Sequence, residues 1–77
     1  MPCRNAERAI LNLGFVEKKK KGKGGGSSHR QFTKIIDKRL HKVTLDCHKG
    51  EVNAKNVRSM IAQAGVTRQA FYEAAYS

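Results

Sequence analysis

The sequence of 77 residues has few cysteines and few acidic residues, and it contains no long apolar run. Its two cysteines, Cys3 and Cys47, are too few and too far apart for a disulfide framework, and Cys47 is predicted to be a small core residue. Together with His48 they lack the short spacing of a zinc site, so we predict no metal site and no cofactor. The lack of a charged, apolar leader or of a membrane-spanning stretch predicts a reduced, cytoplasmic setting without a membrane partner.

The length of the chain allows one domain, residues 1–77, with one small core. A chain of this size buries only roughly 60% of the surface that it exposes when unfolded. The single low-complexity segment is a Lys/Gly/Ser stretch at residues 18–28. Because the chain before it is too short to fold alone, we predict that this stretch is a loop within the domain.

Positive charge is what the chain has in excess. Sixteen Lys and Arg stand against six Asp and Glu, and ten of the sixteen lie between Lys18 and Lys42, where Asp37 is the only acidic residue. Such a local excess predicts a nucleic-acid partner, because bound phosphates release their counterions. The alternatives are a run that only keeps the protein soluble and an anionic membrane surface. The membrane is disfavoured because glycines interrupt the run and it has no helical apolar face.

Apolar residues recur with helical spacing over residues 5–13. Asn5 is the predicted N-cap and Gly14 the residue that follows the C-terminus. Phe15 is placed to contact Ile10 in a Schellman-type helix end. The first predicted element is therefore a short helix.

A second helix is predicted over residues 53–64, with Asn53 as its N-cap and Gly65 just beyond its end. Thr67 is predicted to cap a third, short helix, in which Phe71 would form part of a hydrophobic staple. These two helices would meet at the glycine.

Between the helices the apolar period changes to two, which predicts strands at 15–20, 29–36 and 41–47 with a turn at 37–39. The element order is α-β-β-β-α-α. Three antiparallel strands need one covered face, and the amphipathic helices can cover it. We therefore predict a two-layer α+β fold.

Strand alternation predicts where the histidines point. If Phe32 and Ile36 face the helices, His29 faces away from them. On the following strand the same alternation places four residues on the uncovered face, the last only if the strand persists: Lys42, Thr44, Asp46 and His48.

His29 directly follows the glycines and serines of the basic loop. Free backbone N–H groups and hydroxyls there could hold a phosphate within reach of the imidazole. The other interpretation is a flexible hairpin loop beside a surface histidine with no task. The predicted phosphate-binding or RNA-binding residues are Lys19, Lys20, Lys21, Lys23, Gly25, Gly26, Ser27, Ser28, Arg30 and Lys42.

With these residues identified, the chain resembles the HicA family of bacterial toxins. The resemblance rests on Leu13-Gly14-Phe15, on Ser28-His29, on His48 followed by Lys-Gly-Glu-Val, and on residues 57–67, VRSMIAQAGVT. It implies a fold like that of double-stranded RNA-binding domains, cleavage of mRNA, catalysis by His29, and inhibition by a HicB-type antitoxin. The chain departs from the family where Ser27 replaces the usual glycine and where Asp46 stands at a position that is often proline.

The function predicted from these observations is metal-independent endoribonuclease activity. His29 would act as general base on the ribose 2′-hydroxyl, because a histidine exchanges protons near neutral pH. For the second acid-base group the alternatives are His48, Lys42, water, or His29 of a second copy. The competing hypothesis is a non-catalytic module of the double-stranded-RNA-binding type.

Overall fold

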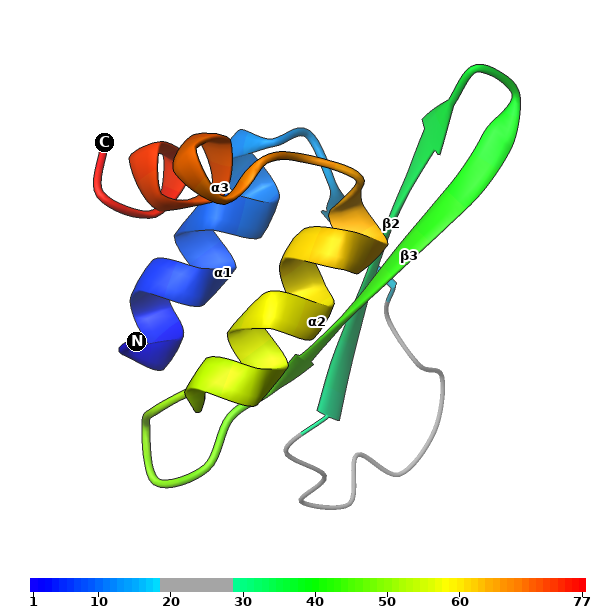
Figure 1. Ribbon diagram of the computed structural model, residues 1–77. Helices are drawn as coiled ribbons and strands as arrows, with labels where there is room; N and C mark the ends of the chain where they lie inside the picture. The colour runs from blue at the N-terminus through cyan, green and yellow to red at the C-terminus, as the bar shows by residue number, and fades with distance from the viewer. Residues whose placement is uncertain (19–28) are drawn as a thin grey trace.

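The computed structural model describes residues 1–18 and 29–77 (Figure 1). The order of its elements confirms the predicted α+β fold. No helix within the described ranges is long and apolar enough to span a membrane. The elements are α1 (Cys3–Asn12), β1 (Val16–Glu17), β2 (His29–Ile36), β3 (Arg39–Asp46), α2 (Ala54–Ala64) and α3 (Arg68–Ala75).

The three strands form one antiparallel sheet in the order β1-β2-β3. The helices lie on one side of this sheet, and α3 packs mainly on α1. Figure 1 also shows the β2–β3 hairpin running past the helices, so that its tip stands clear of them. The opposite side of the sheet carries none of the described helices, and we call it the open face.

The core lies between the sheet and the helices. Phe32, Val43 and Leu45 from the sheet are fully buried, as are Ile10, Met60 and Phe71 from the three helices. On the strands these buried residues alternate with more exposed ones, as period-two patterning requires. The hydrophobic effect therefore determines which side of each strand faces the helices.

Helix α1 begins at Cys3, and the prediction of Asn5 as its N-cap was wrong. The backbone N–H of Cys3 donates to the carbonyl of Gly50 at 2.8 Å, so a contact distant in sequence holds the start of the helix. Asn5 instead donates its side-chain Nδ2 to the carbonyl of Ala75 at 2.9 Å. The asparagine thus ties α1 to the end of α3.

The other predicted helix ends are confirmed. Gly14 has φ of +95°, and the N–H of Phe15 donates to the carbonyl of Ile10 at 3.1 Å, which is the Schellman pattern. Asn53 caps α2 by accepting from the backbone N–H of Asn56 at 2.8 Å. Thr67 Oγ1 caps α3 in the same way, accepting from the N–H of Ala70 at 3.0 Å.

The hairpin turn is one residue shorter than predicted. Asp37 and Lys38 have φ of 51° and 65°, and Arg39 is already paired with Ile36 in the sheet. Positive φ at both central residues is the type I′ geometry, which matches the twist of two-residue hairpins. A three-residue turn would have placed Cys47 opposite His29, whereas the observed turn places Asp46 there.

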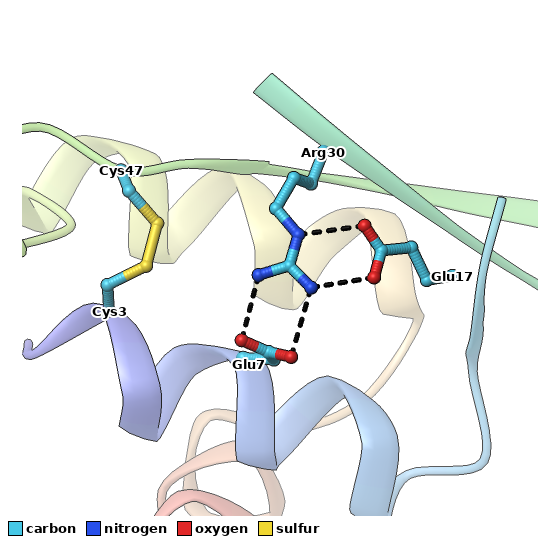
Figure 2. Close-up of polar contacts among 5 residues, drawn as sticks. All are labelled: Cys3, Glu7, Glu17, Arg30 and Cys47. Carbon is cyan, nitrogen blue, oxygen red and sulfur yellow. Dashed lines mark hydrogen bonds and ion pairs between the residues drawn. A yellow bond between two sulfur atoms is a disulfide. The ribbon is translucent and has the colours of Figure 1, made fainter. Parts of the chain in front are cut away.

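Cys3 and Cys47 form a disulfide across 44 residues of sequence, with their Cα atoms 5.8 Å apart (Figure 2). Cys47 packs against the core, but the prediction of it as a small core residue did not include this bond. Sequence spacing concealed the pairing, because only the folded chain brings the start of α1 beside the end of β3. Backbone hydrogen bonds from Cys3 to Gly50 and from Val52 to Met1, each 2.8 Å, hold the same two segments together.

Candidate active site on the open face

The open face is built from alternate residues of the three strands. Its cross-strand pairs are His29 with Asp46, Gln31 with Thr44, Thr33 with Lys42 and Ile35 with Leu40, and Val16 of β1 extends the third row. His29 is 60% exposed at the first position of β2. The alternation that buries Phe32 thus presents the imidazole on the side without helices.

Asp46 lies directly against His29. The distance from His29 Nε2 to Asp46 Oδ1 is 3.5 Å, within the range of an ion pair when the imidazole is protonated. The other carboxylate oxygen, Oδ2, accepts a hydrogen bond of 3.4 Å from Nδ2 of Asn56, in the first turn of α2. The carboxylate therefore lies between the imidazole and the N-terminal turn of a helix.

His48 lies beyond the end of β3, which stops at Asp46. The backbone N–H of His48 donates to the carbonyl of Glu51 at 2.8 Å, and the N–H of Glu51 donates back at 3.0 Å, forming a tight turn. Lys49 and Gly50 at the centre of the turn both have positive φ. His48, Asp46 and Asn56 all line an open hollow of about 380 Å³. Asp46 therefore contacts His29 and also lines the hollow that His48 lines.

Lys42 is exposed on the same face as His29 but further along β3. It lies four residues before Asp46, which corresponds to about 14 Å along an extended strand. The two side chains therefore leave the backbone at separate points along the open face.

Arg30 lies on the helix-facing side of β2, where Figure 2 shows it directed toward Glu7 of α1. Because neighbouring strand residues alternate, it is on the opposite side of the sheet from His29. Its Nε and Nη2 donate to Glu17 at 2.8 and 2.6 Å, and its Nη1 and Nη2 donate to Glu7 at 2.8 and 3.0 Å. The hydrogen bonds to Glu17, then those to Glu7, raise the pKa of Arg30 above the usual arginine value. Arg30 thus joins α1, β1 and β2, and the structure does not bring it together with His29.

Lys34 also has a structural contact on the helix-facing side. Its Nζ donates to the carbonyl of Leu13 at 2.7 Å, at the C-terminus of α1, and lies 5.9 Å from the ring centre of Phe15. A cation at a helix C-terminus is favourable because the last carbonyls carry partial negative charge. Among the described cations between Lys18 and Lys42, Arg30 and Lys34 therefore support the fold.

The comparison with protein families agrees with the resemblance seen in the sequence. A family model described as HicA toxin of bacterial toxin-antitoxin matches residues 3–66, from the start of α1 to just beyond α2. The chain belongs to the HicA toxin family. It is the toxin of a bacterial toxin-antitoxin pair, and membership implies a cognate antitoxin. No curated protein matches the chain closely enough to count as a relative.

Several residues predicted for the HicA site fall on residues 19–28, outside the described part of the chain. The structure therefore leaves their predicted role in phosphate binding as a prediction. These residues are Lys19, Lys20, Lys21, Lys23, Gly25, Gly26, Ser27 and Ser28.

The sequence analysis missed the direct contact between Asp46 and His29, and the contact of Asn56 with Asp46. Strand alternation correctly placed Asp46 and His29 on one face. The missing information was the register of β2 against β3, which decides the residue opposite His29. A two-residue turn at Asp37-Lys38 determines this register. No local sequence signal relates Asn56 to this face, because α2 reaches Asp46 only through tertiary packing.

Proposed function

We propose that this HicA family toxin is a metal-independent endoribonuclease that cleaves mRNA, with residues 1–77 as one domain and His29 as the catalytic residue. The observation that supports it best is the exposed imidazole of His29 at the start of β2, on the open face and against a carboxylate. An acid-base group on an accessible, basic surface is what cleavage of a phosphodiester requires.

In the proposed reaction, His29 takes the proton of a ribose 2′-hydroxyl. The O2′ atom attacks the adjacent phosphorus in line, the bond to O5′ breaks, and a cyclic phosphate remains. Lysines among residues 19–28 would stabilise the charge that develops on the phosphate oxygens. Lys42 would hold a neighbouring phosphate. Arg30 is left out of the RNA contacts, because Glu7 and Glu17 already hold its guanidinium.

The leaving O5′ needs a proton. His48 fits this role better than Lys42, because it lines the same hollow as Asp46, whereas Lys42 lies about 14 Å away along the strand. We therefore propose His48 as the general acid.

The partner proposed for the open face is an acidic antitoxin of the HicB type. Three large apolar side chains on this face are exposed to water: Val16 at 68%, Ile35 at 72% and Leu40 at 67%. Exposed apolar groups that share one face of a protein are typical of a protein interface. An acidic partner would bury them, screen the basic charge and cover His29. The pair would act in the cytoplasm, where mRNA is found.

The test is cleavage of labelled single-stranded RNA by the purified protein in EDTA. We expect the wild type to release fragments with cyclic phosphate ends and to leave DNA of the same sequence intact, because DNA has no 2′-hydroxyl. His29→Ala should abolish cleavage while RNA binding is kept. Cleavage by His29→Ala at the wild-type rate would refute the assignment.

His41→Ala is the matched control, since His41 is half-buried on β3 and has the helix-facing alternation of Val43. This variant should cleave RNA like the wild type if it is folded. The competing function, a non-catalytic RNA-binding module, predicts that the wild-type protein retards RNA in a gel without cutting it.

A further inference from the structure

Asp46 and His29 occupy directly opposed positions at one end of the hairpin. Asp46 is the last residue of β3 and His29 the first residue of β2, and the sheet register pairs them. Their side chains meet on the open face, with Nε2 of the imidazole 3.5 Å from Oδ1 of the carboxylate. Because Nε2 makes this contact and Nδ1 does not, the contact influences which of the two ring nitrogens carries the proton.

The carboxylate itself is held from a second direction. Asn56 Nδ2 donates to Asp46 Oδ2 at 3.4 Å, and the backbone N–H of Asn56 donates to the cap oxygen of Asn53 at 2.8 Å. The position of Asn56 is thus set by the N-cap of α2. A carboxylate near a helix N-terminus is also favoured by the partial positive charge there.

The backbone on both sides of Asp46 is well anchored. Leu45 is fully buried in the core, and the backbone N–H of His48 donates to the carbonyl of Glu51 at 2.8 Å. Asp46 therefore has little freedom to move away from the imidazole. Groups that position a catalytic side chain need this kind of support from the surrounding structure.

We infer that Asp46 is a positioning residue for His29 and that Asn56 holds Asp46 in place. The inference rests on the proposed ribonuclease function and deepens it. A neutral imidazole has one N–H and one nitrogen with a basic lone pair. When Asp46 accepts the Nε2–H of His29, the basic lone pair is on Nδ1, and this nitrogen takes the proton of the 2′-hydroxyl. The carboxylate then stabilises the imidazolium that forms, as the aspartate does in hydrolytic triads.

A purely structural ion pair between Asp46 and His29 would affect the stability of the fold and not kcat. Both side chains are at least one-third exposed, and exposed pairs contribute only about 0 to 1 kcal/mol to stability. Removing the carboxylate should therefore change the melting temperature little. A positioning role predicts a clear loss of kcat with a nearly unchanged KM.

The experiment compares Asp46→Asn and Asp46→Ala with Asp37→Asn, in the full-length protein. Asp37 lies in the turn at the far end of the hairpin, so its variant removes the same charge away from His29. We expect both Asp46 variants to lose roughly 10- to 100-fold in kcat. Asn56→Ala should lose less, since it removes only the support of the carboxylate. Asp37→Asn should keep wild-type kcat.

A second measurement does not depend on activity. Nitrogen-15 spectra of the imidazole show which ring nitrogen is protonated. The proton should be on Nε2 of His29 in the wild type, and the share of the tautomer with the proton on Nδ1 should be larger in Asp46→Ala than in the wild type. Identical spectra and identical kcat in the two proteins would overturn the inference, even if His29→Ala is inactive. If the wild type does not cut RNA, the proposed function fails, and the spectra still decide whether Asp46 positions His29.

Discussion

Arg30 forms a two-point ion pair with Glu7, in which Nη1 and Nη2 lie 2.8 and 3.0 Å from the two carboxylate oxygens. Glu17 occupies the remaining edge of the same guanidinium. One side chain of the basic segment thus connects α1, β1 and β2, next to the residue proposed to be catalytic.

We predict that Arg30→Met lowers the free energy of unfolding by about 1 to 2 kcal/mol, as measured by urea denaturation. This magnitude allows for solvent screening, because all three side chains are about one-third exposed. The raised pKa of Arg30 means that its contribution is fully present below the unfolded-state value and is lost only as pH rises through the folded-state value. Both lie in the strongly alkaline range. Titration of Arg30 should therefore not change the difference between wild type and variant from pH 7 to pH 10.

The same variant separates a structural role from RNA contact. If Glu7 and Glu17 occupy the guanidinium, the slope of log K against log salt for RNA binding should be the same in Arg30→Met as in the wild type. Lys42→Met is the comparison. Its slope should be smaller by about one, which is the change expected when one phosphate contact is lost. An equal reduction in both variants would show that Arg30 also binds RNA.

The hairpin turn should become more stable when Lys38 is replaced by glycine. Lys38 has φ of 65°, a conformation that costs a residue with a Cβ about 1 kcal/mol and costs glycine almost nothing. Lys38→Gly should raise the melting temperature by about 4 to 8 °C in a domain of this size. Lys38→Ala removes the same charge but keeps the Cβ, so its melting temperature should not rise. Equal increases in both variants would mean that charge, and not backbone conformation, is responsible.

The Cys3–Cys47 disulfide closes a loop of 44 residues. By the chain-entropy model such a closure stabilises the folded state by roughly 4 kcal/mol, so dithiothreitol should lower the melting temperature by about 16 to 32 °C. The chain has no other cysteine, and a Cys3→Ser/Cys47→Ser variant should therefore be insensitive to the reductant. Titration of two free thiols in unreduced, denatured protein would contradict the pairing. In a reducing compartment the dithiol form is expected.

Leu40 should contribute to antitoxin binding because it lies exposed on the open face. Burying one such side chain is worth about 1.5 to 3 kcal/mol, so Leu40→Ser should weaken the complex roughly 10- to 100-fold in a binding titration. Leu11→Ser is the matched control, since Leu11 is also exposed but lies on α1. Equal Kd values for Leu40→Ser and the wild type would place the antitoxin elsewhere.

Local rules were enough for much of the fold and for part of the site. Helical spacing, the caps at Asn53 and Thr67, and the glycines after α1 and α2 all act within a few residues, so the chain order alone predicts them. Strand alternation likewise placed His29 on the uncovered face, because its period depends only on the backbone.

Tertiary structure decided what depends on residues far apart in the chain. A one-residue difference in the turn at Asp37-Lys38 determined that His29 meets Asp46 and not Cys47. Packing of α1 against the end of β3 joined Cys3 to Cys47 and held Arg30 between two carboxylates. Sequence therefore determined which elements form and which way His29 faces. Only the folded chain, through its register and packing, determined which side chains meet it.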